Sequence, residues 1–417
     1  LNADGAISNE TGRSATVWSS YDAFGRPGLV TLPDNTFTKY LYQGVQWVGT
    51  EQYLAQNISG TETCGRRWNR FDRQGRLDRV EEGDVCTVTG GPVGQISEYS
   101  FDEAGHLTKV CQNGSGSTCG QQRLFSYDNR GFLTSEQHPE KGGASGQGTV
   151  SYSCFDARGH NRYRDDGTTA RRLAYTFDGF ERLTKVRAPS GSETCGNAAE
   201  SGTTWKLFTY ATANSGSNAR KGKLETAMSR NELGAPAFAA GSVANVTETY
   251  TYQDRGGRVS NRATSVSGTG VTTESWQVAQ STNPLGRLEN QNFPTCVSGP
   301  GCTAGPPTTY TTAAYEDGLL KSITVNGGGF LLAGMTYHPS GMPAVITHSS
   351  AGSIIETITQ AANGMARPSS ITITAPNETV PFTTGTFAYD AAGNIKTMGS
   401  DHFRYDCYSR LVEAQMG

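Results

Sequence analysis

The chain has 417 residues, which by length alone is enough for two or three ordinary domains, and its formal net charge is −3. A charge this close to neutral argues against nucleic acid or an anionic membrane as the partner. Hydrophobic residues make up only 35% and glycine numbers 52, a composition that favours many short strands and tight turns over one thick core. No apolar run reaches the roughly 18 residues that a membrane-spanning helix needs.

A seven-residue phrase recurs along the chain: an aromatic residue, Asp, two variable residues, Gly, a basic residue and Leu. Its clearest copy runs from Phe71 to Leu77. A phrase that returns every few tens of residues indicates a repeat array, so the whole chain, 1–417, is predicted to be one repeat region without an internal domain boundary. The clear copies, given by their aromatic, Asp and Gly positions, are Tyr21, Asp22 and Gly25; Phe71, Asp72 and Gly75; Phe101, Asp102 and Gly105; Tyr127, Asp128 and Gly131; Phe155, Asp156 and Gly159; Tyr389, Asp390 and Gly393; and, without the Gly, Tyr405 and Asp406.

Several copies depart from the phrase. The copy that begins at Phe177 has Glu181 where Gly is expected, and the copy at Tyr252 has Gln253 where Asp is expected. A polar insertion around residues 190–222 lies between these two copies. Loops of variable length are therefore expected to hang from a regular frame.

The phrase itself predicts a β-hairpin. An Asp followed three residues later by Gly is typical of a type I turn, in which the Asp side chain bonds the turn backbone and Gly takes a positive φ. Such a turn closes a hairpin through a one-residue bulge. In the strand that follows one turn, Leu107 and Val110 are three apart and cannot share a face of a regular strand. Either a bulge intervenes or both faces carry apolar residues. No convincing amphipathic helix is found, so the predicted fold class is all-β.

The phrase is similar to the YD repeat of the RHS family, which includes bacterial Rhs and wall-associated polymorphic toxins, the B and C subunits of insecticidal Tc complexes, and animal teneurins. The resemblance extends from about Tyr21 to Leu411. It implies an array of β-hairpins forming one long antiparallel sheet that spirals into a hollow shell or barrel. In the bacterial members the shell encloses a C-terminal toxin domain. The family's core segment with its autoproteolytic aspartates is not found in this sequence, nor is a toxin domain.

Neither end of the sequence looks like a natural terminus. Leu1 is not an initiator residue, and Gly417 follows directly on a repeat copy. An array of this kind needs capping units at its ends, and none is recognised. The chain is therefore expected to be a piece of a longer polypeptide.

The nine cysteines suggest disulfides. Two pairs enclose short, polar, glycine-containing loops, and a third pair flanks a longer stretch. The disulfide candidates are Cys111 with Cys119, Cys296 with Cys302, and Cys64 with Cys86. Disulfides would place the chain in an oxidising, extracellular setting; the alternative is free, buried thiols. Zinc is disfavoured, because no CxxC occurs and the His residues are not clustered with the cysteines.

No catalytic residues, metal ligands or cofactor are predicted. The sequence has no G-x-S-x-G elbow and no HExxH motif, and the repeated Asp residues are assigned to the turns. The stretch from Gly216 to Lys223 imitates a phosphate-binding loop, but Leu224 stands where Ser or Thr is required. Arg interleaved with Tyr is interpreted as cross-strand pairing on a sheet rather than as base stacking.

These observations predict a non-enzymatic structural protein, a stretch of RHS shell that encapsulates or presents a toxin or effector. The expected partner is an encapsulated C-terminal toxin domain or the rest of the same polypeptide, and the expected location is secreted or at the cell surface. The alternative is an extracellular adhesin or scaffold whose loops bind a partner surface or a carbohydrate. A shell predicts large apolar side chains along a cavity, whereas an adhesin predicts a filled interior and side-chain clusters at loop tips.

Overall fold

The computed structural model describes residues 15–56, 62–83, 94–113, 119–141, 148–167, 172–190, 193–196, 200–233, 241–300, 302, 310–325, 329–348, 354–376, 378–406 and 408–417. Regular structure in these ranges is β-strand, apart from one short 3-10 helix, η1 (Pro139–Lys141). The predicted all-β class is confirmed.

The chain divides into two compact units, one made of Leu1–Phe125 with Gly334–Gly417 and the other of Ser126–Ala333. The strands before the second unit are β1 (Val17–Ser19), β2 (Leu29–Thr31), β3 (Phe37–Gln43), β4 (Trp47–Gln56), β5 (Glu62–Phe71), β6 (Leu77–Gly83), β7 (Gly94–Phe101), β8 (Leu107–Gln112) and β9 (Gln121–Tyr127), whose last residues belong to the second unit. The second unit continues with β10 (Leu133–Gln137), β11 (Thr149–Phe155), β12 (Asn161–Asp166), β13 (Leu173–Phe177), β14 (Leu183–Pro189), β15 (Gly202–Tyr210), β16 (Leu224–Glu232), β17 (Val243–Gln253), β18 (Arg258–Gly268), β19 (Val271–Thr282), β20 (Leu288–Asn292), β21 (Thr295–Ser298), β22 (Tyr310–Glu316), β23 (Leu319–Val325) and β24 (Gly329–Leu332). The first unit ends with β25 (Gly334–Tyr337), β26 (Pro343–His348), β27 (Ile354–Gln360), β28 (Pro368–Thr374), β29 (Phe382–Thr383), β30 (Phe387–Tyr389), β31 (Ile395–Met398), β32 (Asp401–Tyr405) and β33 (Leu411–Gln415).

Strands β1 to β24 form a 24-stranded sheet, β25 to β29 a five-stranded sheet and β30 to β33 a four-stranded sheet. Every pairing with a defined register is antiparallel, and with few exceptions the partner is the next strand along the chain, as in β5 with β6 and β6 with β7. One exception is β19, which pairs with both β20 and β21. The predicted long antiparallel array of hairpins is confirmed.

The meander separates two kinds of connection. The turn from β5 to β6 is a repeat phrase, the connection from β6 to β7 is longer, and the turn from β7 to β8 is again a repeat phrase. Because successive strands run in opposite directions, successive connections lie at opposite ends of the strands. Within this part of the first unit, the repeat turns therefore lie together at one end of the strands, and the longer loops lie at the other end.

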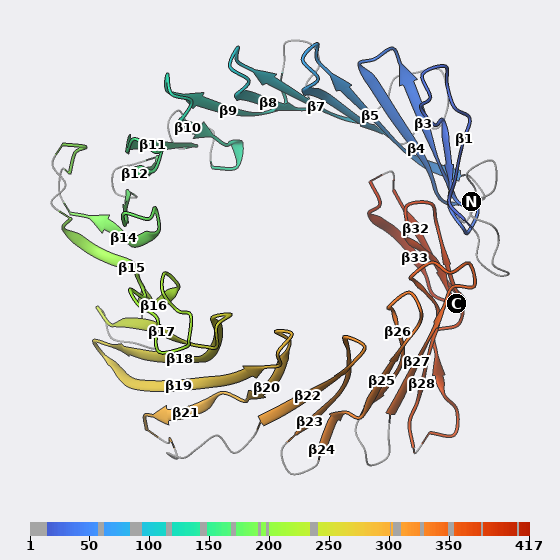
Figure 1. The fold of residues 1–417 in the computed structure, drawn as a ribbon. Helices are drawn as coiled ribbons and strands as arrows, with labels where there is room; N and C mark the ends of the chain where they lie inside the picture. Colours follow the sequence, from blue (N-terminus) through green and yellow to red (C-terminus); the bar gives the residue numbers. More distant parts are fainter. Residues whose placement is uncertain are drawn as a thin grey trace. The chain divides into compact units, whose positions relative to one another are not determined.

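Within each unit the strands lie in a single layer (Figure 1). A two-layer sandwich would bury every second residue of each strand. Here most strand residues are only half-buried, and few described apolar residues are fully covered, among them Val80, Val150, Tyr163 and Ala174. Stability must therefore come largely from contacts along the sheet rather than from a thick core.

In the first unit, strands far apart in sequence meet. Strand β32 packs beside β4 (Figure 1). Arg367 forms an ion pair with Asp34. The hydroxyl of Tyr408, at the tip of the last repeat turn, accepts a bond from the Gln95 amide at 3.2 Å and donates to the Glu82 carbonyl at 3.4 Å.

Candidate functional site

The repeat turn has the same hydrogen-bond pattern in each clear copy, and the copy at Asp72 shows it fully. The Gly75 amide donates to the Asp72 carbonyl at 3.0 Å, and the Asp72 amide donates to the Arg76 carbonyl at 2.8 Å. The Asp72 carboxylate accepts the Arg76 amide at 2.9 Å and the Arg76 Nε at 2.7 Å. Gly75 has φ +79°, the left-handed conformation that glycine adopts without strain. One carboxylate thus orders both the turn backbone and the basic side chain.

The positive-φ position is where copies differ. It is occupied by glycine at Gly25, Gly75, Gly105, Gly131, Gly159 and Gly393, each bonded to its Asp. Glu181 takes φ +68° and Ser409 takes φ +58° in the two copies without glycine. At Asp254 the turn lies one residue later than the phrase predicts: Asp254 itself caps it, and both Asp254 (φ +57°) and Gly257 (φ +60°) are left-handed. The interpretation of Gln253 as the replacement for Asp is therefore wrong.

A bulge follows several of the repeat turns, and the one after the Asp102 turn settles the question left open by Leu107 and Val110. Phe101 pairs with Leu107, but Ser100 pairs with Lys109 and Tyr99 with Val110. The extra residue, Thr108, donates its hydroxyl to the Ser100 carbonyl at 3.1 Å. Because Phe101 and Tyr99 are two apart, their partners Leu107 and Val110 lie on the same face.

Consecutive turns are linked through the basic residue. The Arg76 guanidinium, held by Asp72, lies 4.6 Å from the ring centroid of Phe101, the aromatic residue of the next copy. Such cation–π contacts stabilise by about 0.5–1 kcal/mol when exposed. The same contact joins Arg26 to Tyr42 at 4.0 Å and Arg182 to Tyr210 at 4.1 Å.

The tyrosine hydroxyls add a second link between neighbouring copies. Three of them donate to the backbone carbonyl of a leucine 27 or 28 residues earlier: Tyr210 to Leu183 at 2.9 Å, Tyr252 to Leu224 at 2.6 Å and Tyr315 to Leu288 at 2.8 Å. Tyr389 donates instead to the Pro368 carbonyl at 2.8 Å. The aromatic, Asp, basic and Leu positions of the phrase are therefore all used in contacts within or between hairpins. The phrase is a joining motif, and the turn carboxylates that the structure describes are bonded to the turn backbone.

The turn carboxylates are held in their charged form. The backbone amide of Arg76 and its side chain lower the pKa of Asp72 below its usual value. The side chain of His160 lowers the pKa of Asp156 to about 2. Hydrogen bonds to the carboxylate, rather than a catalytic pairing of acids, cause both shifts.

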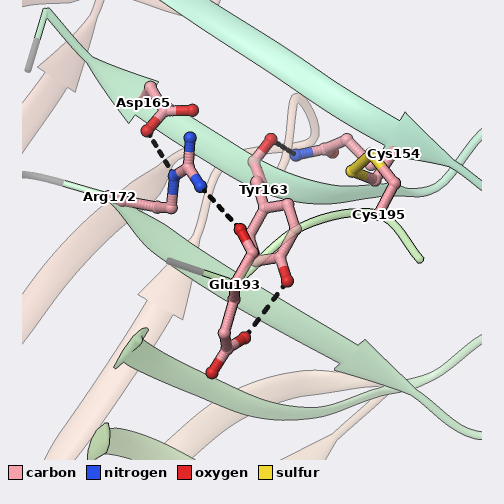
Figure 2. The surroundings of a disulfide bond; sticks show 7 residues. Cys154, Tyr163, Asp165, Arg172, Glu193 and Cys195 are labelled. Carbon is pink, nitrogen blue, oxygen red and sulfur yellow. Dashed lines mark hydrogen bonds and ion pairs between the residues drawn. A yellow bond between two sulfur atoms is a disulfide. The ribbon is translucent and has the colours of Figure 1, made fainter. Parts of the chain in front are cut away.

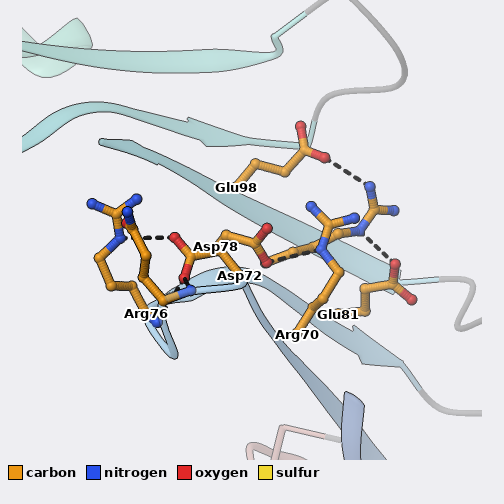
Figure 3. Close-up of polar contacts among 8 residues, drawn as sticks. Arg70, Asp72, Arg76, Asp78, Glu81 and Glu98 are labelled. Atoms are coloured by element: carbon orange, nitrogen blue, oxygen red, sulfur yellow. Dashed lines mark hydrogen bonds and ion pairs between the residues drawn. The ribbon is translucent and has the colours of Figure 1, made fainter. Parts of the chain in front are cut away.

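Ion pairs within and between neighbouring strands lie on β5 to β7 in the first unit (Figure 3). Arg79 bonds Glu81 at 2.5 Å and Glu98 on the neighbouring strand at 2.7 Å, and Arg70 bonds Asp78 at 2.8 Å. The Arg residues thus pair with acids on the sheet surface, as the sequence predicts.

The most deeply buried ion pair of the described residues, Arg187 with Glu193, lies in the second unit, and Figure 2 shows its Glu193 beside Tyr163. Arg187 on β14 is 1% exposed, and Glu193 in the loop between β14 and β15 is 5% exposed. Arg187 Nη1 and Nη2 donate to the two oxygens of Glu193, each at 2.6 Å. Tyr163 on β12 donates to the same carboxylate at 3.1 Å. The bonds from Arg187 lower the pKa of Glu193 to about 2.

A disulfide fixes the loop that carries Glu193. Cys195 is joined to Cys154 on β11, with Cα atoms 5.2 Å apart (Figure 2). Arg172, held by Asp165 at 2.7 Å, donates to the Glu193 carbonyl at 3.2 Å. The loop therefore folds back over one face of β12 to β14 and covers Tyr163 and Arg187.

A pocket of about 420 Å³ adjoins this disulfide. Cys154 and Cys195 form part of its wall, with Phe155, Phe177 and Tyr175 as aromatic lining. The charged groups in its wall include both signs. Of the acids, Asp156 is bonded to His160 and Glu200 to Lys185.

The cysteines expected to pair can be compared with the structure. Disulfides join Cys111 to Cys119 and Cys296 to Cys302, each with Cα atoms 5.5 Å apart. Cys86 lies outside the described residues, so the pair that it would form with Cys64 does too. The bond between Cys154 and Cys195 was missed, because Cys154 directly precedes a repeat copy and Cys195 lies 41 residues later in the polar insertion. The three expected pairs left Cys154, Cys195 and Cys407 over, and that remainder was the only available signal.

Other kinds of site are not found in the part of the chain that the structure describes. No group of three or more His, Cys, Asp or Glu side chains there could hold a metal ion. Within the same ranges, no helix has the length and apolar character needed to cross a membrane.

The fold of the chain is similar to that of several solved structures. A crystal structure of TcdB2–TccC3–Cdc42 and a structure of the Photorhabdus luminescens Tc holotoxin pore each give a TM-score of 0.66 at 14% sequence identity, over 94% of this chain and 19% of theirs. A crystal structure of TcdB2–TccC3 gives 0.65 at 15% identity. The chain shares the fold of these Tc toxin proteins. The sequence predicted a resemblance to the RHS family, which includes the Tc B and C subunits. The shared fold confirms this resemblance.

The chain spans about a fifth of the length of the Tc structures, 19% in each case. No protein-family model matches the sequence. No curated protein matches it either.

Proposed function

We propose that this chain is a non-enzymatic stretch of RHS-type shell that encloses or presents a toxin or effector, and that it acts outside the cell. The observation that supports this most is the single-layered sheet of joined hairpins, which has the fold of Tc toxin proteins over 94% of the chain. A sheet of this kind serves as a wall. Its repeat turns are consumed by contacts between hairpins and offer no chemistry of their own.

Containment accounts for features that an enzyme would not need. The turn carboxylates are bonded to backbone amides and to basic side chains, and the acids on the strands in Figure 3 are paired with Arg70 and Arg79. Disulfides at Cys111, Cys154 and Cys296 fit an oxidising, extracellular setting. The partner on this proposal is a C-terminal toxin domain or the rest of the same polypeptide.

The test is denaturing mass spectrometry of the native particle purified from its source, combined with protease treatment before and after denaturation. A longer polypeptide, or a separate fragment that stays protected until the particle is denatured, is the expected result. A particle in which every associated fragment is cut at once under native conditions would overturn containment.

An adhesin remains the second candidate because some apolar turn tips are exposed. Phe24 and Phe180, each at the third position of a repeat turn, are both 80% exposed. Binding to host cells or to a glycan array that is lost in a Phe24→Ser and Phe180→Ser double variant, with folding unchanged, would favour the adhesin.

A further inference from the structure

The Glu193 carboxylate lies in a complete carboxylate-binding site. Arg187 presents two donors side by side at 2.6 Å each, the geometry in which a guanidinium recognises a carboxylate most strongly. Tyr163 adds a third donor at 3.1 Å, and the Ser201 hydroxyl a fourth at 3.3 Å. Arg187 and Tyr163 are each only 1% exposed.

The strands hold the two main donors without help from Glu193. Tyr163 on β12 is in register with Ala174 on β13, and Ala174 is in register with Arg187 on β14. The three residues therefore lie in a row on one face of the sheet. Glu193, by contrast, belongs to the loop between β14 and β15. The site is part of the sheet, and its occupant comes from a loop.

One covalent bond keeps that loop in place. Cys195, two residues after Glu193, is bonded to Cys154. A tethered carboxylate competes at a high effective concentration and excludes carboxylates from solution, an advantage that falls when the tether lengthens. If the loop leaves, Arg187 remains as a charge on the sheet face without its counter-ion, a state that favours capture of another anion.

We propose that Arg187 and Tyr163 form a carboxylate-binding site that Glu193 occupies while the Cys154–Cys195 disulfide is intact, and that binds the carboxylate of an acidic peptide once this disulfide is reduced. Reduction by a dithiol breaks the sulfur–sulfur bond. Two electrons and two protons pass from the dithiol, which becomes a disulfide, and Cys154 and Cys195 become thiols. The inference does not depend on what the chain encloses.

The first experiment follows the loop in the full chain. A glutamyl endopeptidase cuts after Glu193 only when the loop leaves the sheet. We expect cleavage there to be at least tenfold faster in dithiothreitol, and equally fast without reductant in a Cys154→Ser and Cys195→Ser double variant. The matched control is Cys111→Ser with Cys119→Ser, which removes another disulfide and is expected to leave this cleavage slow. Equal cleavage rates in the oxidised wild type and the Cys154/Cys195 variant would overturn the proposal that the disulfide holds the Glu193 loop on the sheet.

The second experiment tests the site, with sodium acetate as the probe. In Glu193→Ala, acetate at ten times its Kd is expected to raise the melting temperature by about 3 °C over sodium chloride of equal ionic strength. Oxidised wild type and Glu200→Ala, which loses an exposed carboxylate paired with Lys185, should show no acetate-specific rise. If Glu193→Ala does not fold, the reduced wild type serves instead, since acetate should speed its cleavage after Glu193. No acetate-specific effect in whichever of these two is measured would overturn the binding site.

Discussion

The repeat turns and the Glu193 cluster represent two ways of using a carboxylate. In a turn, Asp72 bonds groups no more than four residues away, and the arrangement recurs along the chain. In the cluster, Glu193 bonds Tyr163, which is 30 residues away, and is buried with Arg187. The turns tolerate replacement, since Glu181 and Ser409 stand where glycine is usual. A second buried Arg–Glu pair, Arg66 with Glu51, joins β5 to β4 in the first unit. Because the turn is repeated, losing one copy should affect the stability of the sheet little. The Glu193 cluster, by contrast, depends on one buried ion pair and one disulfide.

The largest expected effect comes from removing one partner of the buried pair. Glu193→Ala leaves Arg187 charged and without its counter-ion, which should cost about 3–5 kcal/mol of unfolding free energy. Urea unfolding of the oxidised chain measures it. The control is Glu200→Ala, whose partner Lys185 is 3.3 Å away at the surface, and which should cost less than about 1 kcal/mol. Equal losses in the two variants would mean that burial of the pair does not matter.

Two glycines separate backbone strain from packing within the turns. Gly75 has φ +79° and nothing within 4 Å of an added Cβ, whereas at Gly159, with φ +95°, the Cβ would meet the Phe132 ring at 2.7 Å. Gly75→Ala should therefore cost about 1–2 kcal/mol through the backbone alone. Gly159→Ala should cost more, about 2–4 kcal/mol, because the ring must also move. Chemical denaturation of both variants checks the order, and a smaller loss at Gly159 would contradict it.

The link between hairpins can be isolated with a double-mutant cycle. Arg182→Gln with Tyr210→Leu removes a cation–π contact of 4.1 Å, and the coupling energy should be about 0.5–1 kcal/mol. Tyr210→Phe keeps the ring but loses the bond to the Leu183 carbonyl, so it separates the two contributions. Pairing Arg182→Gln with Tyr252→Leu, a ring in another turn, should give a coupling near zero. A coupling of the same size in that control would show that the cycle reports general destabilisation.

The smallest expected effect is the change in melting temperature when a single turn carboxylate is protonated at acidic pH. The turn carboxylates, such as Asp72 and Asp156, have a folded-state pKa below their usual 3.8, at about 2 for Asp156. Their contribution is present above pH 4 and is lost as the pH falls toward 2. Glu193 behaves alike, since its pKa falls from 4.5 to about 2. Melting temperatures should stay level from neutral pH to about pH 4.5 and fall below it, with a slightly shallower fall in Asp72→Asn. Stability that rises between pH 4.5 and pH 2.5 would contradict these shifts.

The sequence by itself determined the all-β class and, in the six copies with glycine, the left-handed residue of the repeat turn. It could do so because the Asp72 turn closes through hydrogen bonds between residues at most four apart, so the residue types alone select the conformation. The Cys111–Cys119 and Cys296–Cys302 disulfides could be predicted for the same reason, because each closes a short loop.

Only the tertiary structure decided the bulge at Thr108 and the grouping of Cys154, Tyr163, Arg187 and Glu193. The bulge depends on the register between two strands, and local sequence allowed two solutions. The cluster depends on which strands become neighbours and on the path of a loop between β14 and β15. Its residues are scattered over about 40 positions, and contacts at that range are set by the folding of the whole sheet rather than by any local pattern.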